Sequence, residues 1–125
     1  MSGSIGAEGA EQERRAEFER LVGEALDGIP AELRAQMSNV AVVVEDDPPP
    51  GEHLFGLFQG IPMTRRGSSY AGVLPDRITI YRHPIERYCR GDRELLAEQV
   101  KRTVLHEVAH HFGISDQRLV DIDRY

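Results

Sequence analysis

The pattern of apolar and polar positions predicts helices near the start of the chain. Apolar residues recur there at three- and four-residue spacing, namely Phe18, Leu21, Val22 and Ala25. This spacing forms one stripe along a helix, so we expect a helix over Glu11–Leu26 that Gly28 brings to an end. Pro30 suits a first helical turn and predicts a second short helix over Ala31–Met37. Residues Met1–Ala10 lack an apolar period and are expected to form a flexible tail.

Short segments farther along the chain have the pattern of β-strands: Asn39–Glu45, Leu54–Gln59 and Arg77–Arg82. The first is apolar and rich in β-branched valine, the second is interrupted by Gly56, and the third alternates apolar with polar residues. The run Asp46–Gly51 is rich in proline and predicts a loop between the first two strands. His83 and Pro84 should end the third strand, with a helical turn over Pro84–Cys89.

The clearest helix follows these strands. Asp92 is a good N-cap residue, and Gly113 predicts the helix end. An apolar stripe suited to packing on a sheet is formed by Val100, Val104, Val108 and Phe112. A short terminal helix is predicted over Asp116–Arg124. We therefore expect an α+β fold in which a small sheet of about three strands packs on the long helix, with N-terminal helices beside it.

Composition narrows the class of protein. A chain of 125 residues fits one domain, which we place at residues 11–125. The net charge of −6 argues against binding to nucleic acid, which needs a basic surplus. No apolar stretch is long enough for a bilayer and no N-terminal segment resembles a secretory signal, so we expect a cytoplasmic protein without membrane contact. The single cysteine, Cys89, excludes an internal disulfide and a multi-cysteine zinc finger.

The segment His106-Glu107-Val108-Ala109-His110 matches the pattern H-E-x-x-H on the last long predicted helix. Positions four apart differ by about 40° around a helix, so both imidazoles project from one face, one turn apart. They can bind the same zinc ion at about 2 Å each. The alternative is a helix with two surface histidines beside a glutamate.

Glu107 follows the first histidine, so its carboxylate can face a water molecule on the zinc ion without binding the metal. Zinc lowers the pKa of that water toward neutrality, and a carboxylate can then take its proton. The pattern therefore predicts a zinc-dependent metallopeptidase with one zinc ion per chain and Glu107 as general base. The expected substrate is a peptide or protein.

A zinc site of this kind needs a third protein ligand and an open position for water. The sequence continues as His110-x-x-Gly113-x-x-Asp116, where glycine permits a left-handed turn and the chain can swing back toward the metal. Asp116 is the predicted third ligand. Its alternative role is the N-cap of the terminal helix.

Other polar residues are candidates for the same site. His111 points about 140° away from His106, so we expect a buried, hydrogen-bonded histidine instead of a ligand. Possible contacts to the substrate or transition state are Tyr81, His83 and Arg65, although an ordinary loop histidine is the alternative for His83. His53 is expected in solvent, and Cys89 is expected to behave as a small buried hydrophobe. The strand Leu54–Gln59 is the predicted edge for pairing with a peptide, with Gly56 allowing close backbone approach.

With its H-E-x-x-H segment the chain resembles the zincin metalloproteases. It is similar to a family of small bacterial zincin-like metallopeptidases. The matching stretches are ALDGIP, NVAVVVED, LFGLFQGIPMTRRG, VLPDRITIYRHPIE and VLHEVAHHFGISDQRL. They cover nearly everything from Phe18 onward. The resemblance implies a minimal zincin fold and zinc held by His106, His110 and Asp116, with Glu107 catalytic.

One departure from the metzincin pattern is visible. Metzincins place a methionine turn beneath the metal after the third ligand, whereas the last methionine here is Met63. Support under the site must therefore come from elsewhere. A second hypothesis accompanies the peptidase: a zinc-stabilised regulatory or protein-interaction domain with little turnover, in which a fourth protein ligand would close the metal site. The oligomeric state and the preferred substrate stay open.

Overall fold

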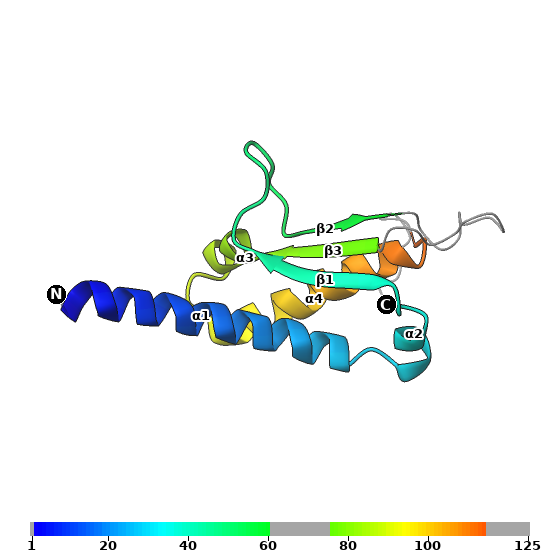
Figure 1. The fold of residues 1–125 in the computed structure, drawn as a ribbon, viewed down its shortest axis with the longest axis horizontal. Coiled ribbons are helices and arrows are strands. Elements are labelled where there is room, and N and C mark those ends of the chain that lie inside the picture. Colours follow the sequence, from blue (N-terminus) through cyan, green and yellow to red (C-terminus); the bar gives the residue numbers. More distant parts are fainter. Residues whose placement is uncertain (1, 61–75, 115–125) are drawn as a thin grey trace.

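The structure of the chain is a computed structural model that describes residues 2–60 and 76–114. Within these ranges the chain forms three strands and four helices (Figure 1). In chain order they are α1 (Ser2–Asp27), α2 (Ala31–Ala35), β1 (Val40–Glu45), β2 (Gly56–Gln59), β3 (Asp76–Tyr81), α3 (Arg82–Cys89) and α4 (Arg93–His111). This arrangement confirms the predicted α+β fold with a small sheet.

The strands form a mixed sheet with β3 at its centre. β3 runs parallel to β1 and antiparallel to β2, so the strand order is β1-β3-β2. In this register Val44 and Gly56 both lie opposite Ile80, on the same face of the sheet. Because side chains alternate along a strand, Thr79 and Tyr81 belong to the other face. β2 is an edge strand in the described part of the chain, as predicted.

The core lies between this sheet and the helices. α4 packs against β2 and β3, and also against α1 and α3. The predicted stripe on α4 is confirmed, since Val100, Val104 and Val108 are buried and Phe112 packs against the core. Burial of such a stripe is the main driving force that fixes a helix on a sheet. The helix that carries the predicted zinc ligands is thus part of the core.

The helix α1 runs beside α4 and extends beyond the sheet at its N-terminal end (Figure 1). Its buried residues Phe18, Val22 and Ala25 come from the predicted stripe. The predicted start at Glu11 is wrong, because residues 2–10 are helical as well. Residues 2–10 (SGSIGAEGA) contain three glycines and two serines, which disfavour a helix, so neither an apolar stripe nor propensity predicts this extension. That this segment is flexible stays a prediction.

Other boundaries differ by a few residues. The β2 ladder begins at Gly56, although the backbone N–H of Tyr81 already donates to the carbonyl of Phe55 at 2.8 Å. α3 starts at Arg82, immediately after β3, because Pro84 is tolerated in a first helical turn where its missing N–H costs nothing. The terminal helix predicted over Asp116–Arg124 lies outside the described residues. No helix within the described ranges is both long and apolar enough to cross a bilayer.

A buried arginine joins α1, the loop after β1 and α3. Arg82 is only 1% exposed, and its guanidinium contacts three carboxylates. Its Nε donates to Asp46 at 3.0 Å, its Nη1 donates to Glu86 at 3.1 Å, and its Nη2 donates to Glu11. A buried cation is tolerated only when it is paired in this way.

The guanidinium of Arg82 lowers the pKa of two of these carboxylates, Glu11 and Asp46. The hydrogen bond from Arg82, followed by that from Arg14, lowers the pKa of Glu11 to about 2. At Asp46 burial acts to raise the pKa, but the hydrogen bond and charge of Arg82, with the charge of Arg15, outweigh it and lower the pKa. Both carboxylates therefore favour the charged state in the folded protein.

Acid should weaken this cluster. Because the pKa of Glu11 is about 2 when folded against 4.5 for an ordinary glutamate, its stabilising ion pair is complete above pH 4.5 and is lost as the pH falls toward 2. We predict that Glu11→Gln lowers the Tm at pH 7 by roughly 2 °C and that the two Tm values converge near pH 2, followed by circular dichroism. An equal loss in Glu32→Gln, an exposed position on α2, would contradict this assignment.

Candidate metal centre

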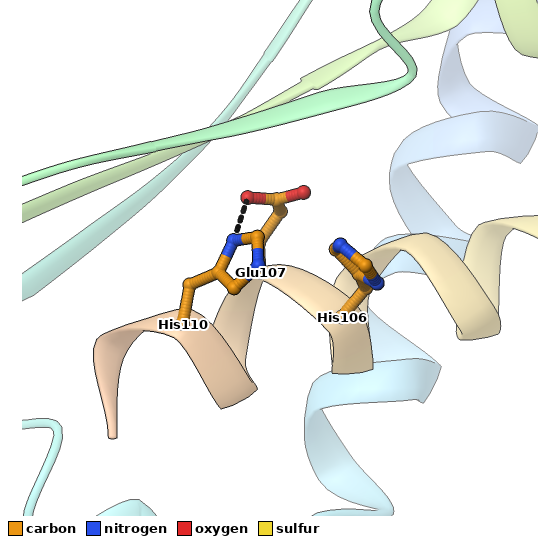
Figure 2. A group of neighbouring side chains, drawn as sticks. All are labelled: His106, Glu107 and His110. Carbon is orange, nitrogen blue, oxygen red and sulfur yellow. Dashed lines mark hydrogen bonds and ion pairs between the residues drawn. The ribbon is translucent and has the colours of Figure 1, made fainter. Parts of the chain in front are cut away.

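The C-terminal half of α4 brings the predicted zinc-site residues together. One ligand atom from each of His106, Glu107 and His110 lies within 4.8 Å of the other two. All three side chains project from the same side of α4 (Figure 2). The imidazole rings of His106 and His110 have centroids 4.5 Å apart and stand edge to face at 73°. The four-residue spacing therefore places both rings one helical turn apart, as predicted.

Glu107 is the most buried of the three. Its side chain is 7% exposed, whereas that of His110 is 26% exposed. Oε1 of Glu107 lies 3.3 Å from Nδ1 of His110. Since an ionised carboxylate can only accept, a hydrogen bond at this contact has Nδ1 of His110 as its donor. A metal binds a histidine through a deprotonated ring nitrogen.

The donor set fits zinc. Zinc binds imidazole nitrogen at about 2.0–2.1 Å and accepts carboxylate oxygen as a further ligand. Two ligands on a tetrahedral zinc lie about 3.4 Å apart by that geometry, so separations within 4.8 Å require only small side-chain rotations. The site holds no thiol, since the one cysteine, Cys89, is buried elsewhere in the core. His106 and His110 are therefore the residues that would hold the ion.

The helix ends immediately after the second histidine. The backbone N–H of Gly113 donates to the carbonyl of His110, and that of Ile114 donates to the carbonyl of Ala109, both at 2.9 Å. Gly113 has φ of 84°, the left-handed conformation that this pair of hydrogen bonds requires. The left-handed turn predicted at Gly113 is therefore confirmed. The predicted third ligand, Asp116, lies outside the described residues.

His111 is buried, as predicted. It is 1% exposed, and its Nδ1 lies 2.9 Å from Oδ2 of Asp76, which is 2% exposed. Asp76 begins β3, so this pair ties the end of α4 to the central strand. The side chain of His111 also contacts the ring of Phe58 edge-on, with centroids 5.8 Å apart. His111 thus belongs to the support of the helix and is directed away from the His106–His110 pair.

A pocket of about 380 Å³ opens beside the metal-binding residues. It combines apolar and polar side chains from α4 with one residue just before β2. Its lining residues are Phe55, Gln99, Arg102, Thr103, Leu105, His106 and Glu107. A molecule in this pocket would touch both His106 and Glu107, which is the position that a substrate needs.

Gly56 lies at the contact between β2 and α4. A Cβ atom at this position would lie 2.9 Å from Cγ2 of Thr103 and 3.0 Å from Cγ of Glu107. This glycine therefore allows a close approach between β2 and α4. The physical reason is that position 56 shares the face of Ile80, which is packed toward the helices. The approach of a peptide backbone at Gly56 stays a prediction.

Two predicted contact residues lie away from the pocket. Tyr81 belongs to the sheet face opposite Ile80, and its pKa is raised mainly by burial and further by Glu45. His83 is in α3, where its Nδ1 lies 3.1 Å from a carboxylate oxygen of Asp47. Neither residue lines the pocket. That Tyr81 and His83 contact the substrate stays a prediction.

Arg65 lies outside the described residues. His53 is exposed, as predicted. Cys89 is buried and its thiol pKa is raised by burial, which agrees with its predicted behaviour as a small hydrophobe.

Sequence reasoning did not single out most residues of the pocket wall. Gln99 and Thr103 precede Glu107 by eight and four positions, so helical spacing alone places them on the same face of α4. That signal was present in the sequence. Phe55 comes from a segment far away in the chain and no local pattern marks it as a neighbour of α4.

Comparison with known families agrees with this geometry. The family model described as "Zincin-like metallopeptidase" matches residues 37–125, which include β1 to α4 and the whole H-E-x-x-H segment. The chain therefore belongs to the zincin-like metallopeptidase family. A search of curated proteins finds none that matches this chain.

Zinc binding is the first property to test. We predict that His106→Ala and His110→Ala each weaken zinc binding by ~100-fold or more, because each removes one imidazole ligand. Competition with a chromophoric chelator measures the affinity. His53→Ala, at an exposed histidine in the loop before β2, is the matched control and should bind zinc as the parent does. Parental affinity in both α4 variants would exclude this site.

Proposed function

We propose that the chain is a zinc-dependent peptidase in which Glu107 is the general base. The observation that carries this proposal is the burial of Glu107 between two imidazoles on one side and a pocket on the other. A structural zinc site needs no such carboxylate facing a pocket. Membership of the zincin-like metallopeptidase family supports the same reading.

The chemistry follows from the position of the carboxylate. A bound zinc ion supplies Lewis acidity toward water and toward a peptide carbonyl. Glu107 accepts the proton of the attacking water and then delivers it to the nitrogen of the leaving amine. Its low exposure and its contact with Nδ1 of His110 hold the carboxylate near the position where this proton transfer occurs. The peptide is thereby split into a carboxylate and an amine.

Asp116 completes the ligand set in this proposal. It follows Gly113 by three residues, and the hydrogen bonds at Gly113 and Ile114 end α4 with a left-handed residue. A side chain three residues beyond such a turn is within reach of a metal on the preceding helical turn. Asp116→Ala is therefore the third variant in the zinc titration and should behave like the two histidine variants.

The substrate in this proposal is an extended peptide. β2 is an edge strand in the described part of the sheet, and an extended peptide can add to such an edge through backbone hydrogen bonds. β2 also packs on α4 beside Glu107, so a peptide on that edge passes the pocket. Phe55 and Leu105 give this pocket apolar walls, which suit a large apolar side chain next to the scissile bond.

Removal of the base tests the mechanism. We predict that Glu107→Gln lowers kcat by about 10²–10⁴-fold, because the amide cannot accept the proton, while zinc binding is retained. A peptide library with mass-spectrometric detection, with and without chelator, measures the loss. Glu98→Gln, at an exposed position of α4, is the matched control and should keep parental activity.

Cleavage that persists at the parental rate in Glu107→Gln would refute the role of the carboxylate. A parent protein that binds zinc but cleaves nothing would favour the alternative, a zinc-stabilised interaction domain.

The pocket wall provides a separate test of substrate choice. Leu105 is 40% exposed, so its truncation should spare the fold. We predict that Leu105→Ala reduces the preference for leucine or phenylalanine over alanine beside the cleaved bond by about tenfold in kcat/KM, because apolar contact is lost. Leu33→Ala on α2 is the matched control, since Leu33 is also 40% exposed. An equal change in both variants would argue against a side-chain pocket at Leu105.

A further inference from the structure

Glu107 lies in a slot with three walls. His110 stands on its C-terminal side, with Nδ1 3.3 Å from the carboxylate. Thr103 lies one helical turn before it on the same face of α4. Gly56 of β2 closes the slot from the sheet, at the contact where a Cβ atom would lie 3.0 Å from Cγ of Glu107. The side chain is therefore bounded by α4 itself and by the edge strand.

The wall formed by Gly56 is tight because it consists of backbone. A Cβ atom there would also lie 3.3 Å from the carbonyl oxygen of Thr79, which belongs to the central strand and cannot swing aside. A methyl group at position 56 must therefore push toward α4. The two atoms that would meet it are Cγ2 of Thr103 and Cγ of Glu107.

The wall formed by Thr103 is fixed by hydrogen bonds. Its Oγ1 donates to the carbonyl of Gln99 at 2.8 Å and accepts from Nε2 of Gln99 at 3.1 Å. With the hydroxyl held toward the preceding turn, the methyl group of Thr103 is held toward β2. The residue is buried, so this orientation is maintained by packing as well.

We propose that Gly56 is a positioning residue for the general base: its missing side chain, together with the fixed methyl group of Thr103, sets the place of the Glu107 carboxylate. This inference rests on the proposed role of Glu107 in catalysis. It adds a residue of the edge strand to the parts that determine the rate. Gly56 itself touches neither the reacting atoms nor the zinc-binding histidines.

The expected effect of filling the slot is specific. A methyl group at position 56 requires Cγ of Glu107 to move by a few tenths of an ångström. Since a displacement of about 1 Å in a catalytic group can cost about 10²-fold in rate, we expect a smaller loss, of about 3- to 10-fold. His106 and His110 do not meet the new methyl group among its nearest contacts, so zinc binding should be kept. The loss should appear in kcat, because the displaced base slows the chemical step. KM should stay near the parental value, because the contacts that bind the substrate are unchanged.

The experiment compares Gly56→Ala with the parent. The proposal predicts a fall in kcat of about 3- to 10-fold, with KM and zinc affinity each within about twofold of the parent. Gly23→Ala is the matched control, since a Cβ atom on α1 at that position meets nothing within 4 Å, and it should keep parental kcat. Parental kcat in Gly56→Ala, or a loss of zinc affinity as large as the loss of kcat, would overturn the proposal.

A second variant separates positioning from a general loss of stability. Thr103→Ser removes Cγ2, the atom nearest to the new methyl group, and keeps the hydroxyl that bonds Gln99. The double variant Gly56→Ala/Thr103→Ser gains a methyl group at position 56 and loses one at position 103. The space that Thr103 gives up takes the new methyl group, so Glu107 can return to its place. The proposal predicts recovery of most of the kcat that Gly56→Ala loses, a coupling expected for neighbouring residues and not for distant, independent ones. Strictly additive losses would overturn it.

A readout without turnover separates this inference from the proposed function. Nuclear Overhauser effects in the zinc-free protein should connect the α-protons of Gly56 with the methyl group of Thr103 and the γ-protons of Glu107. Gly56→Ala should shift the γ-resonances of Glu107, and the double variant should restore them. If the parent cleaves no peptide, the proposed function fails. These spectra still test whether Gly56 contacts Thr103 and Glu107. Absence of these contacts in the parent would overturn the inference.

Discussion

The packing of α4 on the sheet is the constraint on which the rest of the structure depends. One stripe of this helix is apolar and buried against β3 and α1, and the adjoining face presents His106, Glu107 and His110. Because a helix is rigid, burial of the valines fixes the direction of the metal-binding face. The pairing of His111 with Asp76 adds a second attachment at the end of the helix. The core therefore positions the three described residues of the candidate site.

The core that holds α4 in place includes α1, a helix that precedes the region matched by the family model. The matched region begins at residue 37, whereas Phe18, Val22 and Ala25 of α1 are part of the same buried cluster as the valines of α4. Arg82 fastens α1 a second time, through Glu11. In this chain the metal-binding helix thus has sheet on one side and α1 on another.

Much of this arrangement could be predicted from the sequence, because it depends on local periodicity. The valine stripe of α4, the cap at Asp92, the turn at Gly113 and the burial of His111 all follow from spacing along one helix. The contacts that could not be predicted join distant segments. Nothing local indicates that Gly56 meets Glu107. The extension of α1 to Ser2 has neither an apolar stripe nor a helix-favouring composition that would predict it. The place of Tyr81 depends on which face of β3 packs against α4. Tertiary packing decides this, and no local pattern in the sequence indicates it.

The proposed function depends on a zinc ion that would bind between the two imidazoles of α4 and leave one coordination position open toward the pocket. Anomalous diffraction at the zinc edge, from crystals grown with excess Zn²⁺, tests it most directly. We predict a single strong peak about 2.1 Å from a ring nitrogen of both His106 and His110, with an open coordination position facing Glu107. A map without a peak there, or an ion closed by a fourth protein ligand, would contradict the account.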